Sequence, residues 1–331
     1  MKIPKRTIRK LLEKLCLPHG KSYIKSFFKA AQANTYIETV NGNNADVLHY
    51  HLHKRSSLEL ENAFQAMILP IAKRLKFSSA KIAIDITEEN FYGKPEGLYF
   101  IPCKPEKGVI AKFQFLVASV VNPRRKEKIP FFVMPVHLGQ NKQDIISEII
   151  TVAKKLFRKI DVFLLDRGFY NIALIDILKK KKIPYIIFVP KAEQKKYIIE
   201  SMHEDCATIE WETEYFKNFT KHKVKFNLVF VKDIRGYDWI FATNIDKKYA
   251  DDYVRMYKWR WQIETNFRVE DEAKIKTKSK NYVIRLFYFI MGLLFHIIWS
   301  ITEKGHSPFK AFLIKIYEEC LREEIMQETM V

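Results

Sequence analysis

The sequence predicts an α/β fold in which helices flank a mixed sheet. Three observations support this prediction. Residues 81–136 hold three apolar, β-branched runs in close succession, and residues 142–190 alternate between helical and buried-strand patterns. Residues 283–301 are almost continuously apolar, as in a helix that is buried under a sheet.

Residues 1–78 are predicted to form a basic helical module. Nine Lys or Arg lie within residues 1–30 against one acid, Glu13, and apolar residues recur there at helical spacing. Such a stretch is either a solvated set of helix faces or a unit that binds DNA ends. A further helix is expected at about residues 58–77, interrupted near Pro70.

Residues 79–190 are predicted to form the first part of the core. KIAIDI begins it, and AKFQFLVASVV and IPFFVMPV follow, joined by a polar turn, so three antiparallel strands are expected. The pattern continues as helix, strand, helix, strand, and crossover connections make the last two strands parallel. The expected strand order is 3-2-1-4-5, which is the RNase H-like plan. The expected strands are residues 81–86, 111–121, 129–136, 161–166 and 183–190. The expected helices are about 142–159 and a second one that ends at about 182.

Residues 191–248 are predicted to be a β-rich insertion, because three segments alternate there like strands: TIEWETEYF, KVKFNLVFV and DWIFATNI. Residues 249–331 then complete the core. They begin with a helix that contains Glu264 and end with closing helices at 283–301 and about 307–325.

The composition favours a polyanionic partner. Fifty-seven Lys plus Arg against 38 Asp plus Glu give a net charge of +19, an excess that folding does not require. Nucleic acid is the first partner to consider and an anionic membrane the second. Residues 283–301 have the length of a membrane span, but a buried core helix has the same composition, and we expect no membrane partner.

The four cysteines suggest a reducing compartment. Cys16, Cys103, Cys206 and Cys320 stand alone, with no spacing typical of a zinc site or a disulfide framework. The basic N-terminus lacks the apolar core and cleavage site of a signal peptide. A cytoplasmic location is therefore expected.

Two acids follow buried-type strands. Asp85 is predicted to end the first strand and Asp166 the fourth, and these strands are neighbours in the expected order. Two carboxylates so close repel each other unless a cation lies between them, and their oxygens suit Mg²⁺ or Mn²⁺. An Asp at a strand end is also a common turn or cap residue.

A third acid lies in YKWRWQIETNFR, residues 257–268. At 100° per residue, one sector of about 100° on a helix holds Tyr257, Arg260, Trp261, Glu264 and Arg268. The guanidinium groups would keep Glu264 ionised and grip phosphates, while the rings pack on the core or stack on a base. Alternatively, Glu264 is a solvated residue paired with an arginine. Three carboxylates that hold two ions would support in-line phosphoryl transfer.

These residues resemble the DDE transposases of prokaryotic insertion sequences. The similar branch has a β-strand insertion before the catalytic glutamate and the signature Tyr-x2-Arg-x3-Glu-x6-Lys, whose first three members match Tyr257, Arg260 and Glu264. The resemblance covers about residues 80–300. The other matching motifs are DIT (85–87), LLDRGFY (164–170) and ATNI (242–245).

The resemblance implies that Asp85, Asp166 and Glu264 are catalytic residues that ligate two divalent ions, Mg²⁺ or Mn²⁺. It implies 3′-strand nicking at insertion-sequence ends and cut-and-paste transfer into target DNA by a homodimer, in a prokaryotic, nucleoid-associated setting. DNA contacts are then expected from Tyr257, Arg260, Trp261, Arg268, Lys274 and Arg167.

Some positions leave alternatives open. Asp271 stands where the family has lysine, so Lys274 takes the expected phosphate contact only if the helix end is displaced. Arg167 either touches phosphate or forms a structural ion pair. Trp211 and Trp239 are candidates to stabilise a flipped base, or they are core residues.

Three other functions compete with transposition. An RNase H-like nuclease or resolvase would use the same metal chemistry without strand transfer. A transposase-derived DNA-binding protein would have lost catalysis, although all three acids are present. A membrane-associated basic protein would explain the charge and the apolar segment.

Overall fold

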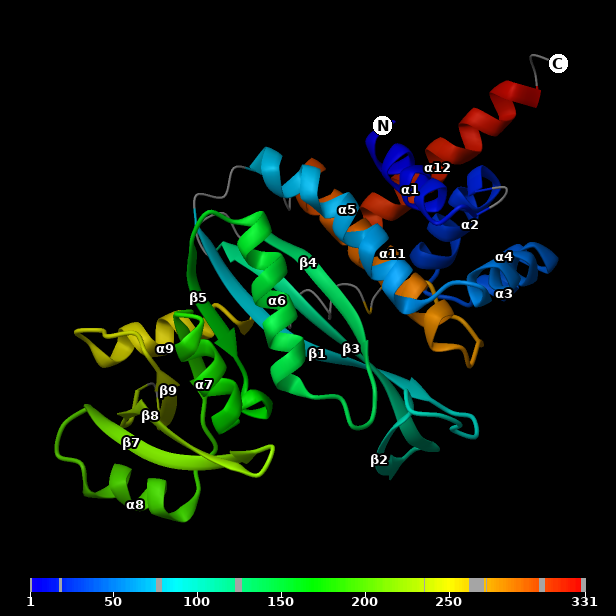
Figure 1. The fold of residues 1–331 in the computed structure, drawn as a ribbon. Helices are drawn as coiled ribbons and strands as arrows, with labels where there is room; N and C mark the ends of the chain where they lie inside the picture. The colour runs from blue at the N-terminus through cyan, green and yellow to red at the C-terminus, as the bar shows by residue number, and fades with distance from the viewer. Residues whose placement is uncertain are drawn as a thin grey trace.

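The computed structural model describes residues 2–17, 20–75, 79–122, 127–234, 236–261, 271, 273–303 and 307–328. In this part of the chain, helices surround a nine-stranded mixed sheet (Figure 1). The strands are β1 (Ala80–Phe91), β2 (Ile101–Glu106), β3 (Val109–Asn122), β4 (Glu127–Val136), β5 (Ile160–Leu165), β6 (Tyr185–Phe188), β7 (Cys206–Lys217), β8 (Thr220–Val231) and β9 (Trp239–Thr243).

The predicted strand order is confirmed. β4 pairs with β3, β3 with β1, β1 with β5 and β5 with β6, and the last two pairings are parallel. This is the 3-2-1-4-5 order of an RNase H-like sheet. The strands of the expected insertion continue the same sheet, because β9 pairs antiparallel with β6 and is followed by β8 and β7.

β2 was not predicted. It pairs with the start of β3, in the register Ile101↔Lys112, at the outer edge of the sheet. Its sequence, IPCKPE, contains Pro102 and Pro105, which cannot donate ladder hydrogen bonds and are tolerated mainly in edge strands. The two prolines made this segment look unlike a strand, although a strand at the edge of the sheet can contain them.

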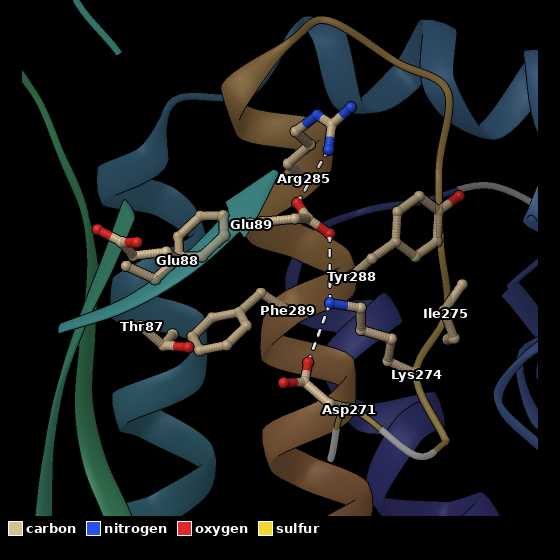
Figure 2. Close-up of a pocket in the computed structure, with 11 residues that line it drawn as sticks. Thr87, Glu88, Glu89, Asp271, Lys274, Ile275, Arg285, Tyr288 and Phe289 are labelled. Atoms are coloured by element: carbon tan, nitrogen blue, oxygen red, sulfur yellow. Dashed lines mark hydrogen bonds and ion pairs between the residues drawn. The ribbon is translucent and has the colours of Figure 1, made fainter. Parts of the chain in front are cut away.

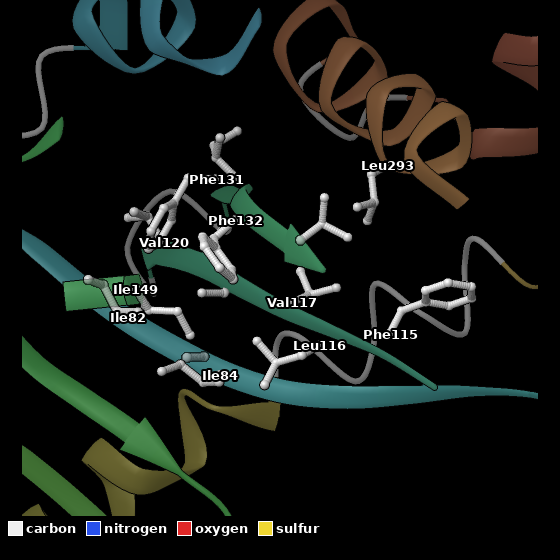
Figure 3. Close-up of a cluster of buried hydrophobic side chains, with 14 of the residues drawn as sticks. Ile82, Ile84, Phe115, Leu116, Val117, Val120, Phe131, Phe132, Ile149 and Leu293 are labelled. Carbon is white, nitrogen blue, oxygen red and sulfur yellow. The ribbon is translucent and has the colours of Figure 1, made fainter. Parts of the chain in front are cut away.

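The sheet has helices on both faces (Figure 1). Alternate residues of β3 face opposite sides: Leu116 lies with Ile84 and Ile149 of α6 on one face, while Val117 and Leu293 of α11 lie on the other (Figure 3). The helices are α1 (Lys2–Lys14), α2 (Gly20–Gln32), α3 (Ile37–Asn41), α4 (Asn43–His53), α5 (Ser57–Leu75), α6 (Lys142–Leu156), α7 (Ile172–Lys180), α8 (Glu193–Ser201), α9 (Ala250–Lys258), α11 (Tyr282–Thr302) and α12 (Phe309–Glu328).

The apolar helix α11 is buried in the protein. It is long and apolar enough to cross a membrane, but 72% of its most apolar window is buried inside the structure. Phe289 of α11 stacks on Phe115 of β3, with ring centroids 4.5 Å apart. The composition of residues 283–301 is thus explained by packing against the sheet.

The N-terminal helices share one core with the C-terminal ones. α1 packs on α5 and α11, and α2 packs on α12 (Figure 1). The expected interruption at Pro70 was wrong, because α5 continues through it. Pro70 and Ala66, whose carbonyl loses its helical partner, are both exposed, so water can replace the missing hydrogen bond.

A candidate active site beside the end of helix α9

Asp85 and Asp166 directly follow a matched pair of residues on parallel strands. Ile84 of β1 pairs with Leu165 of β5, so the next residue on each strand is one of the two acids. Neighbouring strands lie about 5 Å apart, and residues in the same register point to the same face. The two carboxylates are therefore brought to one place on the sheet, on the face that α9 and α11 cover.

The prediction that Asp85 ends its strand was wrong. β1 continues to Phe91, but beyond Ile84 it pairs only with β3. β5 ends at Leu165, so the extension of β1 leaves one side of Asp85 open. The open space beside Asp85 is thus created by the end of β5 and not by the end of β1.

Asp166 is held by the turn that follows it. Its Oδ1 accepts a hydrogen bond from the backbone N–H of Gly168 at 3.0 Å and caps the short 3₁₀ helix Arg167–Phe169. A Cβ at residue 168 would lie 3.2 Å from the same oxygen, closer than ordinary contacts allow. The sequence Asp-Arg-Gly therefore fixes the direction of the carboxylate, and a larger residue at 168 would displace it.

Arg260 joins α9 to the first acid. Its Nη1 donates to Oδ2 of Asp85 at 3.3 Å, and its Nε donates to the Tyr257 hydroxyl at 3.2 Å. Arg260 is 6% exposed and Tyr257 is 2% exposed. The guanidinium stabilises the charge of a carboxylate that has little access to water, and Tyr257 holds the guanidinium in place.

A cleft of about 440 Å³ lies beside Asp166. Its lining combines cations with aromatic rings, a composition that suits phosphates and stacked bases. The lining residues are Asp166, Arg167, Phe188, Tyr237, Trp239, Tyr257, Lys258, Arg260 and Trp261. The structure thus gathers five of the residues predicted from the sequence around one cleft: Asp166, Arg167, Tyr257, Arg260 and Trp261.

Arg167 and Lys258 supply the positive charge of this cleft. Arg167 is exposed, and within the described residues its guanidinium has no ion-pair partner. The expected alternative of a structural ion pair is therefore not seen there. The ammonium of Lys258 lies over Trp239 and Trp261, at 5.5 Å and 5.3 Å from their ring centroids. Sequence reasoning missed Lys258, which lies between two predicted residues.

The two tryptophans of residues 191–248 differ in position. Trp239 lines the cleft and is 6% exposed, with its ring near Tyr237, Tyr257 and Trp261. Trp211 lies on the edge strand β7 and is not among the residues that line the cleft. Of the two candidates, only Trp239 is placed next to Asp166.

A family model described as a transposase DDE domain matches residues 126–298, slightly more than half of the chain. This chain belongs to the DDE transposase family. It is a DNA transposase, an enzyme whose cleavage of DNA depends on metal. The matched span contains Asp166 and Glu264 and begins after Asp85. No curated protein matches the sequence.

A solved structure matches the transposase over nearly its whole length. The cryo-EM structure of a piggyBac transposase synaptic complex with hairpin DNA has a TM-score of 0.56 and 12% sequence identity. The match covers 96% of this chain and 77% of that one. At this identity the likeness shows a shared fold, which includes the N-terminal helices as well as the sheet.

Enzymes of this family use divalent metal ions. The donors present in the transposase fit such an ion, because Asp85 and Asp166 offer carboxylate oxygens from one register position, the ligand type that Mg²⁺ and Mn²⁺ prefer. Among the described residues no group of three His, Cys, Asp or Glu forms a metal cluster. Glu264 and Arg268 lie outside the described residues, so the third acid is not placed.

Lys274 lies in a different pocket from the other predicted DNA contacts. Its ammonium is 3.0 Å from Asp271 and 4.0 Å from Glu89, and Arg285 also binds Glu89, at 2.9 Å (Figure 2). Asp271, which stands where the resemblance led us to expect lysine, thus neutralises the nearby Lys274. The described contacts of Lys274 link β1 to the segment that precedes α11.

The ATNI segment of the transposase has a structural role. Thr243 Oγ1 donates to the carbonyl of Tyr185 at 2.6 Å. The Asn244 side chain accepts from the N–H of Tyr185 and donates to the carbonyl of Ile183. These hydrogen bonds fasten the end of β9 to the start of β6 and so position the chain that leads into α9.

Proposed function

We propose that Asp85, Asp166 and Glu264 together hold two Mg²⁺ or Mn²⁺ ions, and that the transposase nicks the 3′ strands at the ends of an insertion sequence and joins them to target DNA. The observation that carries this proposal is the register of β1 and β5, which aligns Asp85 with Asp166 beside a cleft of cations and rings. α9 ends at Lys258, so the single helix predicted over residues 257–268 is interrupted by a turn at Trp259 and Arg260, and Glu264 comes three residues after Trp261, the last described residue before it.

Bound ions would activate a water molecule or a 3′-hydroxyl and stabilise the leaving oxygen of the phosphodiester. The side chains around them have separate tasks. Arg260 orients Asp85, because it binds Asp85 and is itself fixed by Tyr257. Arg167 and Lys258 hold phosphates next to the cleavage point. Trp261, which is 43% exposed, offers a ring surface to bases that leave the duplex, and the buried Trp239 packs beside it.

We also propose that two copies of the transposase act as a homodimer on paired DNA ends. The similar piggyBac structure is a synaptic complex with hairpin DNA, and its fold spans nearly all of this chain. The net charge of +19 suits two DNA segments held at once, since each phosphate contact requires a cation.

The direct test uses Glu264→Gln on a plasmid that carries both DNA segments flanking the coding region. We expect this variant to bind the DNA as wild type does but to lose Mg²⁺-dependent nicking. Glu318→Gln is the control, since Glu318 lies on α12 with a side chain that is 55% exposed and pairs only weakly with Arg322. Nicking by Glu264→Gln at the wild-type rate would refute the assignment.

A second assay separates transposition from simple cleavage. Labelled DNA with a free 3′-hydroxyl end is incubated with a supercoiled target plasmid and Mg²⁺. Transfer of the label to the plasmid supports a transposase of the proposed kind. Nicking without any transfer would instead identify an RNase H-like nuclease.

A further inference from the structure

A second cleft, of about 770 Å³, lies at the opposite ends of the strands that carry Asp85 and Asp166. Residues at or next to the starts of β1, β5 and β6 line it, together with the end of α7 and residues in and beside α9. Its ionisable lining residues are Lys81, Lys159, Lys179, Lys182, Lys247 and Asp161. Five cations against one acid leave an excess of four positive charges around this cleft, which we call the lysine cleft.

Internal contacts explain only part of this charge. Asp161 pairs with Lys81 at 3.4 Å and with Lys159 at 3.6 Å. Lys179 lies in the last turn of α7, where a cation suits the helix dipole, and its ammonium donates to the carbonyl of Lys225. In the described part of the chain neither Lys182 nor Lys247 has an acidic or aromatic partner for its ammonium.

The lysine cleft is connected to the candidate active site through two consecutive residues. Trp259 lines the lysine cleft, with the Lys81 ammonium 5.3 Å from its ring centroid, whereas Arg260 binds Asp85. Lys81 and Asp85 are four residues apart on the same face of β1. A strand advances about 3.3 Å per residue, so they are separated by roughly 13 Å.

We propose that the lysine cleft binds the sugar-phosphate backbone of the DNA whose scissile phosphate lies at Asp85 and Asp166. A duplex strand advances about 3.4 Å per nucleotide, so 13 Å corresponds to roughly four nucleotides. The contact is electrostatic and independent of sequence, and Trp259 gives the cleft a ring wall. This inference rests on the proposed function, because it assumes that the DNA cut at Asp85 and Asp166 extends to the lysine cleft.

The test compares two charge-matched double variants. Lys182→Gln with Lys247→Gln removes the two unpartnered cations of the cleft. Lys104→Gln with Lys107→Gln removes the same charge from the β2–β3 hairpin, and Lys107 has a positive φ of 48° that matches the 54° of Lys182. Binding of a random-sequence 40-base-pair duplex is measured by fluorescence anisotropy over a series of salt concentrations. We expect only the cleft variant to show a shallower slope of log K against log salt, by about 1.8, or about 0.9 per lost contact.

The ¹⁹F resonance of Trp259 tests whether the DNA lies at the lysine cleft. The transposase is labelled with 5-fluorotryptophan, and the ¹⁹F resonance of Trp259 is assigned with Trp259→Phe. We expect the duplex to shift this resonance in wild type and in the hairpin variant but much less in the cleft variant. Inorganic phosphate at the same phosphate concentration should shift it little. An equal shift by inorganic phosphate would overturn the assignment to DNA and identify a free-phosphate site.

The outcomes also separate this inference from the proposed function. Equal salt slopes in the two double variants, together with Mg²⁺-dependent nicking by wild type, would reject the lysine cleft and leave the enzyme assignment intact. A shallower slope in the cleft variant, without nicking by wild type, would keep the DNA site and reject the catalytic proposal.

Discussion

Arg260 donates a hydrogen bond to Asp85 at 3.3 Å, although 175 residues separate them in the chain. The contact fastens the end of α9 to the centre of β1. Both side chains are largely buried, at 7% and 13% exposure, so each charge depends on the other for solvation. The pair therefore links the segment that leads to Glu264 with the first acid of the proposed metal centre.

Arg260→Met should lower the free energy of unfolding by about 3 kcal/mol, because it leaves a buried carboxylate without its partner. Urea denaturation measures the change. Arg255→Met, on α9 just before the turn that contains Arg260, removes an exposed pair with Asp252 and should cost less than about 1 kcal/mol. Equal losses in the two variants would contradict a special role for the Arg260 contact.

Arg285→Lys should destabilise the protein although it keeps the charge. Arg285 binds Glu89 at 2.9 Å, donates to the carbonyl of Ser279 and lies over the ring of Phe113, and lysine cannot make all three contacts. A loss of about 2 kcal/mol is expected from thermal or urea denaturation. Arg322→Lys, which alters an exposed pair on α12, is the control and should have almost no effect. An unchanged stability of Arg285→Lys would show that the charge alone matters.

Glu61 should make stability depend on pH. It is 5% exposed on α5, and burial, with a smaller effect of Glu148, raises its pKa to about 7. Well below pH 4.5 it is protonated in both folded and unfolded chains. As pH rises from about 4.5 to 7, only the unfolded chain ionises it, so stability falls by up to about 3 kcal/mol. Above pH 7 the loss stays constant.

Glu61→Gln should remove most of this fall, and the variant should be more stable than wild type at pH 8. Urea titrations at pH 4.5, 6 and 8 test this, with Glu318→Gln as an exposed control. A parallel pH dependence in wild type and Glu61→Gln would disprove the role of this carboxyl.

DNA affinity should fall steeply with salt. If the two clefts and neighbouring lysines contact six to ten phosphates, the slope of log K against log salt should lie between about −5 and −9. Anisotropy with a random-sequence duplex measures it. A slope near zero would contradict an electrostatic interface.

Much of the sheet could be predicted because its strands carry clear apolar patterns. The order of β1, β3, β4, β5 and β6 followed from these patterns and from the rules for crossover connections. The length of β1 could not be predicted, because its polar extension, residues 87–90, pairs on one side only and is partly exposed. An apolar pattern indicates burial, and the residues of this extension are polar and only partly buried.

Candidate site residues were predictable where one short motif carries them. Arg260 and Tyr257 were found, but as possible DNA contacts, whereas their described contacts lie within the protein. The lysine cleft escaped prediction because its five lysines come from separate segments of the chain, and only the folded sheet brings them together.

Binding of Mn²⁺ tests the metal centre most directly. Electron paramagnetic resonance titrations count bound Mn²⁺ in wild type, Asp85→Asn and Asp166→Asn, with Asp161→Asn as a control from the start of β5. We expect two bound ions in wild type and in Asp161→Asn, and a loss of binding in the other two variants. Undiminished Mn²⁺ binding by Asp85→Asn and Asp166→Asn would contradict it.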